Sequence, residues 1–501
     1  MSLLSITVAV SAQSKRDYVW LFGYNSNSYP QYPGVDGVVL DFNQVPVDIT
    51  AREIALVLNW NYSGICDTNG NLLLYTNGCA VANGQHEIIE NGNGLSPGAF
   101  FDEFCPDFGY PIPQGIIILP CPGNPNVFYI FHEEGTIISQ VSDPGVKKLY
   151  LTRVDMSLSN GLGEVTNKNE LIIEDSLNYG EVTAIKHANG ADWWLIIPQF
   201  RNEKYYILLV TNEGVVSTIE QSIGFSTTSG GESGGQANFS PDGQFYFRSN
   251  PNDGTFIFDF DRNIGVLSNF RFIPSFGDAG FRGGVVASPN SKLLYVFTGL
   301  HAFQYDLLVE NILESEILIA EFDGFQNPFS TLFYHGRIGP NCKIYVNSNT
   351  TVRNLHVIHY PNERGIACGF EQHAITLPHN NGRTLPNLPS NFNLDVGPPC
   401  DTSLIISSVF SPFPSPQMPE KLFRVFPNPA SDYVMVEPET KKMIKDVRVV
   451  LTNALGAVVL QKQMERRPFL LDTEGILPGI YTLSVFSGAT LLQSERVVIF
   501  D

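Results

Sequence analysis

The sequence predicts an all-β protein: a multi-bladed β-propeller of about seven blades, followed by a small Ig-like β-sandwich. A unit of a turn followed by a strand recurs along the chain, and the prolines that open three of these turns, Pro241, Pro289 and Pro340, lie 48 and 51 residues apart. The 44 glycines, 33 prolines and 12% aromatic residues suit many short strands joined by turns. Repeats of roughly 40–50 residues with several strands each are typical of propeller blades.

The central repeat, residues 239–265, shows why each unit is expected to form strands. Its turn, residues 240–243 (SPDG), combines a proline that presets φ, an aspartate that bonds to nearby backbone, and a glycine that accepts positive φ. In residues 256–261 (FIFDFD), every second residue is phenylalanine, which predicts a strand with two unlike faces. The same unit of turn and strand recurs at residues 66–78, 182–198, 286–297 and 337–346.

The chain is expected to contain four segments in order. Residues 3–12 form an apolar run that ends in small residues before Gln13, which is typical of a signal peptide and its cleavage site. We therefore predict a signal peptide over residues 1–12, truncated at its start because the usual basic residues are missing; a buried first strand is the alternative. The propeller is predicted over residues 18–395, a proline-rich linker over 396–424, and a separate β module over 425–501.

The net charge of −20 disfavours nucleic acid as a partner, because that binding depends on clustered lysine and arginine. No apolar run reaches the roughly 18–20 residues that a transmembrane helix needs, so the chain is not expected to span a membrane. Its seven cysteines contain no CxxC pair, which disfavours zinc ribbons and thioredoxin-type chemistry and suits disulfides in an exported protein.

Two disulfides are candidates. Cys79 and Cys105 could pin the long irregular segment of residues 79–114, since loops of this length in a compact domain are usually functional or fixed in place. Cys342 and Cys368 flank a predicted hairpin and could be bridged across the last blade; the alternative is two separate buried thiols. A bridge between Cys66 and Cys121 follows only by elimination.

Three segments near the C-terminus match one family in the right order: residues 425–432 (VFPNPASD), 447–456 (VRVVLTNALG) and 477–483 (LPGIYTL). They closely resemble the C-terminal sorting domain, type A, of the type IX secretion system of Bacteroidota. The resemblance implies recognition by the type IX secretion machinery and a secreted or outer cell-surface location. The residues that carry the motif are Pro427, Asn428, Pro429, Asp432, Gly456, Gly479 and Tyr481.

The body of the chain resembles a group of secreted β-propeller proteins of Bacteroidota. The matching segments are residues 73–79 (LLYTNGC), 91–95 (NGNGL), 339–346 (GPNCKIYV) and 361–368 (PNERGIAC). The resemblance covers most of residues 18–395. It implies the propeller architecture and assigns no catalytic residue.

Two motifs suggest catalysis and are better explained by structure. Residues 231–235 (GESGG) match G-x-S-x-G, yet a strand and not a helix is predicted to follow, which favours a flexible loop between blades. His132 and Glu133 lie side by side at a predicted strand end without an HExxH pattern, so a metal or acid–base role is disfavoured.

Two further groups could bind a metal ion. His356 and His359 are three residues apart on a predicted strand and should point to opposite faces, which disfavours a shared ion. Asp259, Asp261 and Asn263 form D-x-D-x-N, which could hold calcium, although a solvated blade edge is favoured because the rest of a calcium loop is absent. No catalytic, cofactor-binding or metal residue is therefore predicted, and no cofactor beyond this possibility of calcium.

The favoured function is binding: a propeller face that presents loops to an extracellular glycan or protein ligand. One alternative is an extracellular hydrolase or lyase that acts on polysaccharide or peptide, which would need acids or histidines converging at the central channel. A second alternative is a structural component of a surface assembly. All three rest on analogy with the fold, which by itself does not define function.

Deletion of residues 425–501 should leave the propeller folded and retained inside the cell, because the predicted sorting signal is lost. Cell fractionation and blotting of the truncated and full-length proteins would measure this. Export of the truncated protein at the normal level would contradict the predicted sorting role.

Overall fold

The computed structural model describes residues 14–25, 34–137, 145–227, 234–275, 283–392, 423–428, 430–438, 447–453, 458–464, 469–473, 475–487 and 490–500. The chain divides into two compact units, residues 1–406 and 407–501, which are described separately. The predicted signal peptide, residues 1–12, lies outside the described residues, as does nearly all of the predicted linker.

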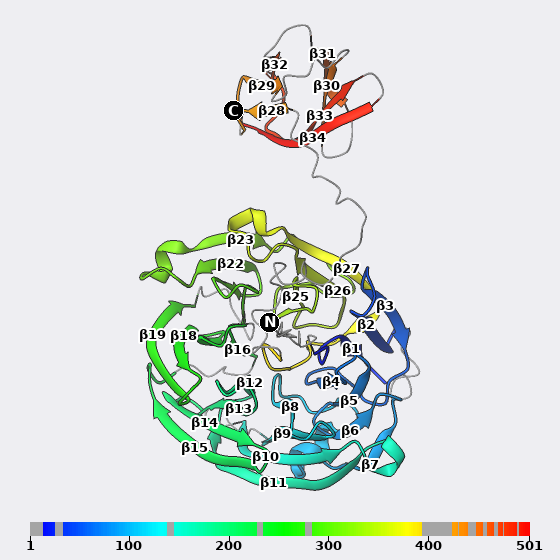
Figure 1. The fold of residues 1–501 in the computed structure, drawn as a ribbon, viewed down its shortest axis with the longest axis vertical. Helices are drawn as coiled ribbons and strands as arrows, with labels where there is room; N and C mark the ends of the chain where they lie inside the picture. Colours follow the sequence, from blue (N-terminus) through cyan, green and yellow to red (C-terminus); the bar gives the residue numbers. More distant parts are fainter. Residues whose placement is uncertain are drawn as a thin grey trace, which may run out of the picture. The chain divides into compact units, whose positions relative to one another are not determined.

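The first unit is a ring of blades around a central axis (Figure 1), and within the described residues it has seven. Blade 1 contains β1 (Val19–Gly23), β2 (Gly37–Asp41) and β3 (Asp48–Arg52). Blade 2 contains β4 (Ser63–Cys66), β5 (Leu72–Thr76), β6 (Ala80–Asn83) and β7 (Ile88–Asn93). Blade 3 contains β8 (Ile116–Pro120), β9 (Val127–Gly135), β10 (Val146–Asp155) and β11 (Glu164–Leu177). Blade 4 contains β12 (Thr183–Lys186), β13 (Trp193–Pro198), β14 (Lys204–Thr211) and β15 (Gly214–Ser222).

The remaining blades follow the same plan. Blade 5 contains β16 (Gln236–Phe239), β17 (Phe245–Asn250), β18 (Gly254–Asp261) and β19 (Val266–Pro274). Blade 6 contains β20 (Gly284–Ala287), β21 (Leu293–Phe297), β22 (His301–Asp306) and β23 (Ile317–Glu321). Blade 7 contains β24 (Gly336–Ile338), β25 (Ile344–Val346), β26 (Val352–Ile358) and β27 (Phe370–Asn381). The short helices are α1 (Ala99–Phe104), η1 (Ser159–Gly161), η2 (Ile312–Ser315) and η3 (Gly365–Cys368).

Each blade is an antiparallel sheet whose first strand lies near the axis and whose last strand lies at the rim (Figure 1). Inner strands such as β12 are short and largely buried, whereas rim strands such as β15 expose many of their residues to solvent. A single parallel pairing of Glu164 with Glu90 joins the rims of blades 3 and 2. The predicted all-β propeller of about seven blades is therefore confirmed.

The middle of each blade is buried on both faces. Phe256 and Phe258 pack against blade 4, whereas Ile257, between them in sequence, packs against blade 6. The predicted contrast between two unlike strand faces is therefore wrong over Phe256–Phe258, where both faces are apolar. The reason is that a propeller blade is covered by a neighbour on each side, which extends the apolar pattern to consecutive residues.

The ring closes by side-chain packing between the first and last blades. Trp20 of blade 1 lies 5.3 Å from the ring of Tyr345 of blade 7 and 4.9 Å from Phe42, measured between ring centroids. Leu355 and Leu377 of blade 7 belong to the same buried cluster. Burial of these aromatic and aliphatic side chains stabilises the closure, since each buries a large apolar area.

Residues 383–392, here called the axial strap, follow the last strand and run along the inner strands (Figure 1). Asn387 is the centre of its contacts. Its backbone N–H donates to Tyr62 O at 2.8 Å, and its Nδ2 donates to Ile116 O and Val182 O, both at 2.9 Å. One side chain thus bonds to the starts of β8 and β12, while its backbone bonds next to β4.

The strap continues toward the opposite end of the inner strands. Ser390 Oγ accepts a hydrogen bond from Phe239 N–H at the end of β16, at 3.1 Å. Phe392 then lies 6.1 Å from Trp193, at the start of β13, in an edge-on arrangement. Because inner strands and second strands run in opposite directions, both contacts lie at the end of the ring opposite to Arg383. The strap therefore occupies the central channel along its length.

The amide side chains of Gln114 and Gln236 bond to the backbone of inner strands along the channel. Gln114 Nε2 donates to Ala237 O at 3.1 Å, and its Oε1 accepts from Ala237 N–H at 2.8 Å. Gln236 likewise accepts from Val285 N–H at 2.9 Å and donates to Gly336 O at 2.9 Å. Each amide therefore supplies the donor and acceptor that a neighbouring strand edge lacks.

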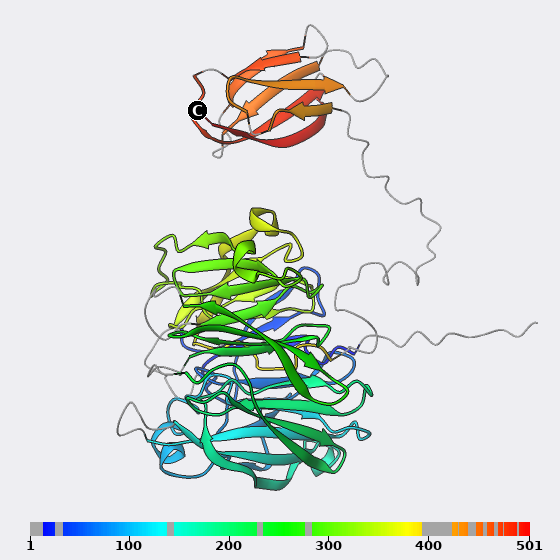
Figure 2. The same ribbon diagram turned by 90° about the vertical axis from the view of Figure 1, so that its left-hand side faces the viewer.

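The second unit is a sandwich of two antiparallel sheets, seen from two sides in Figures 1 and 2. One sheet contains β28 (Phe423–Phe426), β29 (Tyr433–Pro438) and β32 (Phe469–Asp472). The other contains β31 (Val458–Gln463), β30 (Val447–Thr452), β33 (Gly479–Ser487) and β34 (Thr490–Ile499). Val436, Val449, Leu483 and Val497 are among the buried residues between them. The predicted Ig-like sandwich is confirmed.

Replacement Asn387→Ala should lower the free energy of unfolding by about 2–4 kcal/mol, because it removes several buried hydrogen bonds and leaves two carbonyls without a donor. Urea denaturation of the full chain would measure the change. Asn167→Ala serves as a control, since that side chain is exposed and bonds only to nearby Glu170. Equal effects of the two replacements would contradict a special role for the strap.

Candidate functional site

A cavity of about 630 Å³ lies at the end of the propeller where the inner strands begin. Trp60, Pro113, Tyr179 and Tyr334 precede the inner strands β4, β8, β12 and β24 by a few residues. Because these four inner strands run in the same direction along the axis, the segments before them converge at one end. The other described lining residues are Phe100, Phe104, Pro111, Thr136, Ile137, Gly234, Asn349, Thr350 and Arg383.

One wall of the cavity is formed by helix α1, whose position a disulfide fixes. The rings of Phe100 and Phe104 lie 4.7 Å apart, and Tyr110 lies 5.1 Å from Phe100. Cys105, directly after the helix, is bonded to Cys79, so the predicted Cys79–Cys105 disulfide is confirmed. Closing a loop of 26 residues stabilises the fold by about 3–4 kcal/mol in the chain-entropy account.

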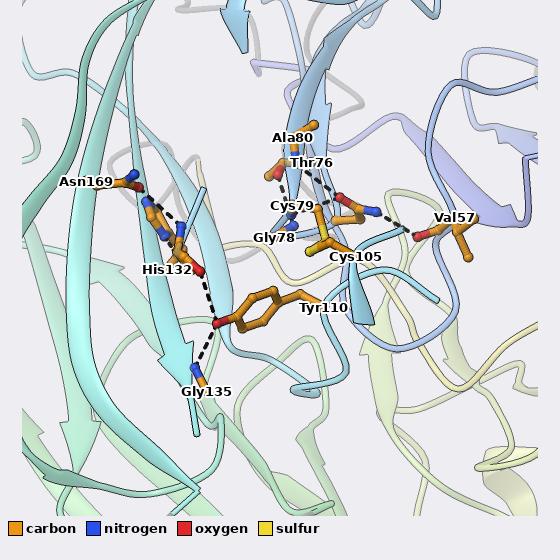
Figure 3. The surroundings of a disulfide bond; sticks show 12 residues. Val57, Thr76, Gly78, Cys79, Ala80, Cys105, Tyr110, His132, Gly135 and Asn169 are labelled. Carbon is orange, nitrogen blue, oxygen red and sulfur yellow. Dashed lines mark hydrogen bonds between the residues drawn. A yellow bond between two sulfur atoms is a disulfide. The ribbon is translucent and has the colours of Figure 1, made fainter. Parts of the chain in front are cut away.

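Polar contacts around the disulfide hold the same wall (Figure 3). Asn77 Oδ1 accepts from Cys79 N–H at 3.0 Å, and its Nδ2 donates to Val57 O at 3.1 Å. The hydroxyl of Tyr110 accepts from Gly135 N–H at 2.8 Å, at the end of β9. The disulfide connects α1 to blade 2, and the hydroxyl of Tyr110 connects the segment after α1 to blade 3.

Arg383, the first residue of the strap, is the only charged residue among the described lining residues. Its guanidinium carbon lies 3.9 Å from the centroid of the Trp60 ring, a cation–π contact. Burial lowers the pKa of Arg383, and the nearby hydroxyls of Tyr334 and Tyr24 oppose this effect. Within the part of the chain that the structure describes, no carboxylate lies within ion-pair distance of it.

A buried ion pair lies next to the lining residues. Glu181, two residues after Tyr179, and Arg248 of β17 form it, and their side chains are 0% and 1% exposed. A Cβ at Gly235 would lie only 2.1 Å from Glu181 Oε1, so only glycine fits at that position. Removing one partner of such a pair typically costs about 3–5 kcal/mol, because the other charge is left buried and uncompensated. We assign the pair to the connection between blades 4 and 5.

His335 also lies beside this region, directly after the lining residue Tyr334. Its Nε2 lies 3.0 Å from Gly235 O, and its ring stacks on Tyr334 with centroids 3.8 Å apart. Burial lowers the pKa of His335 to about 3, so the imidazole is neutral at physiological pH. Its contacts are those of a structural residue that ties blade 7 to the segment before β16.

Glu133 and His132, adjacent on β9, do not form one site. Glu133 Oε2 accepts from Gly180 N–H at 2.9 Å, and Oε1 has no partner among the described residues. Burial raises the pKa of Glu133 well above its usual range, and the charge of Glu181 adds to this. His132 bonds instead to Ser96 Oγ at 2.6 Å and Thr152 Oγ1 at 2.9 Å, since neighbouring strand residues point to opposite faces.

The predicted bridge between Cys342 and Cys368 is wrong. Cys368, on η3, is a free thiol buried among apolar residues that include Phe333 and Ile344. Cys342 lies in the partly exposed turn between β24 and β25 and is disulfide-bonded, but not to Cys368. The flanking positions in sequence were misleading because η3 turns its cysteine into the core between blades 6 and 7.

The bridge between Cys66 and Cys121, suggested by elimination, is not formed, because both cysteines are free and buried. Residues 231–233 of the G-x-S-x-G motif lie outside the described residues.

His356 on β26 and His359, directly after β26, do not share a site. His356 is buried and accepts from His373 N–H at 3.0 Å on Nδ1. His359 bonds instead to Lys343 Nζ at 3.0 Å and to Glu371 at 2.7 Å. The two imidazoles have separate partners, as the strand spacing predicted.

The carboxylates of blade 5 are engaged separately. Asp259 lies 3.5 Å from Arg271, and Asp261 Oδ1 accepts from Asn263 N–H at 2.8 Å in its own turn. No group of three or more potential metal ligands was found among the described residues. The favoured solvated blade edge, with calcium as its alternative, and the absence of any other cofactor stay predictions.

In the second unit, several residues of the predicted sorting motif take part in hydrogen bonds. Asn428 Oδ1 accepts from Val498 N–H at 2.9 Å, and Gly479 pairs with Ile499. The Tyr481 hydroxyl donates to Leu477 O at 2.6 Å. Asp432 O accepts from Thr473 N–H at 2.9 Å, and Pro427 follows β28 directly. Pro429 and Gly456 lie outside the described residues.

Comparisons with known proteins give one family match. Residues 424–500 match the secretion system C-terminal sorting domain. No curated protein matches the chain significantly.

Three solved structures are similar to the chain. A protein from Lactobacillus plantarum is 13% identical over 73% of this chain and 98% of its own, with a TM-score of 0.42. The Dos1 propeller is 12% identical over 66% of this chain and 90% of its own, with a TM-score of 0.36. The periplasmic gluconolactonase of Pseudomonas aeruginosa is 10% identical over 84% and 96%, with a TM-score of 0.37.

The blades and the sandwich define the class: a β-propeller protein with a separate C-terminal β domain. That C-terminal domain is a type IX secretion sorting domain, which directs export to the cell surface or the extracellular space. No helix among the described residues is long and apolar enough to span a bilayer.

Replacement Glu133→Gln should make the protein relatively more stable as the pH rises above about 4.5, the ordinary pKa of glutamate. In the wild type, the unfolded chain releases the Glu133 proton above this pH while the folded chain keeps it, so stability falls until the raised pKa is passed. Melting temperatures from pH 4 to 8 would measure the difference. Glu174→Gln, at an exposed position, is the control; parallel curves for wild type and Glu133→Gln would contradict the prediction.

Proposed function

We propose that the protein is an exported binding protein whose propeller captures a glycan in the cavity at the start of its inner strands. The observation that carries the proposal is the lining itself, in which Trp60, Tyr179, Tyr334, Phe100 and Phe104 surround about 630 Å³. Small-molecule sites are typically concave, about 300–1,000 Å³ and largely apolar, with a few polar groups for orientation. Aromatic rings offer flat apolar faces on which sugar rings can stack.

Hydrolysis of an extracellular polymer is the competing function. Several acids lie close in sequence to the lining residues. Glu133 and Glu181 are buried, whereas Asp102 and Glu103 on α1, beside Phe104 in sequence, are exposed and do not line the cavity. Glu181 is paired with Arg248, and burial raises the pKa of Glu133 well above its usual range. These roles favour binding over hydrolysis as the main proposal.

Glycan arrays and polysaccharide pull-downs with the full chain, read together with product release from the same polymers, test the proposal. We expect retention without cleavage, and we expect Trp60→Ala to abolish it because the cavity loses its largest ring. Tyr360→Ala is the control, since Tyr360 is 66% exposed and does not line the cavity. Cleavage products would support the hydrolase, and equal retention by both variants would exclude this cavity as the site.

A further inference from the structure

We propose that the glycan is acidic: Arg383 binds the anionic group, a carboxylate or a sulfate ester, of a sugar that rests against the aromatic walls of the cavity. This inference rests on the proposed binding function and names the class of its ligand. It assigns Arg383 as the residue that determines specificity.

The charge balance at Arg383 favours an anionic ligand. The protein carries 50 acidic and 30 basic residues, yet this half-buried guanidinium has no carboxylate partner among the described residues. Arg271 is half-buried in the same unit and has Asp259 at 3.5 Å. A partly desolvated cation without a counter-ion gains more from an incoming anion than a paired cation does.

The guanidinium carbon of Arg383 lies over the Trp60 ring, 3.9 Å from its centroid. The side chain makes no hydrogen bond to another described residue, so its N–H donors are available to a ligand. A guanidinium held in this way offers paired donors that match the two oxygens of a carboxylate or sulfate.

Hydrogen bonds within the protein hold the backbone at Arg383 in place without a ligand. Its N–H donates to Asn59 O at 2.6 Å, next to Trp60, so both stacking partners belong to one bonded unit. On its other side, Asn381 Nδ2 donates to Thr384 O at 3.3 Å, and the strap continues into the channel. A preorganised group loses little conformational freedom on binding, which favours affinity.

Two neutral polar residues, Asn349 and Thr350, also line the cavity. Asn349 Oδ1 is buried without a partner among the described residues, and Thr350 Oγ1 donates to Ser330 O at 2.9 Å. A few polar groups in an otherwise apolar lining suit a ligand that carries hydroxyl groups next to its anionic group.

Isothermal titration of the full chain with three matched oligosaccharides tests the proposal. The probes are an oligogalacturonate, the same oligomer with its carboxylates methyl-esterified, and a sulfated galactan oligomer. We expect at least one anionic oligomer to bind, and the methyl ester to bind about tenfold or more weakly. Which anionic oligomer binds decides between carboxylate and sulfate ester.

Arg383→Gln should weaken binding of the anionic oligomer about 10- to 100-fold, the usual range for one charge-assisted contact. Arg383→Lys should retain part of the affinity because it keeps the charge and loses the paired donors. Arg52→Gln is the matched control, since it removes an exposed positive charge outside the cavity. Wild-type affinity should also fall as salt is raised from 50 to 300 mM, a measurement that needs no variant.

Failure of this inference can be distinguished from failure of the proposed function. Equal binding of the ester and the acid, with no effect of Arg383→Gln or of salt, would overturn the acidic ligand; loss of that binding in Trp60→Ala would leave the glycan function standing. Absence of binding to all three oligomers and to the glycan array would overturn both.

Discussion

The rest of this structure depends on how the inner edges of the blades find hydrogen-bond partners. An inner strand pairs on one side only, so its other edge faces the axis with donors and acceptors that would be costly to bury unpaired. Here the axial strap and the amides of Gln114 and Gln236 supply those partners, with Asn387 bonded to Ile116 O and Val182 O. One short segment therefore runs along the channel and connects blades that are distant in sequence.

The cavity lies at one end of the propeller. The strap starts there with Arg383, so the segment that connects the blades also places the one charged lining residue among those described. The Cys79–Cys105 disulfide fixes α1, which forms another wall of the cavity. Cavity shape and propeller stability therefore depend on the same contacts, which is consistent with a rigid binding site.

Prediction from the sequence succeeded for features that are local. The Cys79–Cys105 bridge was predicted correctly because the two cysteines lie within or at the edge of one irregular segment. The predicted Cys342–Cys368 bridge was wrong because η3 turns Cys368 into the core. The candidate site was missed altogether. Arg383 stands alone in sequence, and no local pattern reveals that Trp60, more than 300 residues earlier, lies against it.

The sequence by itself determined the repeated strands, their number within about one blade, and the sorting domain with its three ordered segments. These features follow from period-2 patterns, turn residues and motifs that span ten residues or fewer each. Only the tertiary structure decided that both faces of a blade are apolar, that residues 383–392 occupy the channel, and that the segments before the inner strands form a cavity. The physical reason is that ring closure brings together residues from every part of the first unit, and such long-range proximity leaves no periodic signal in the chain.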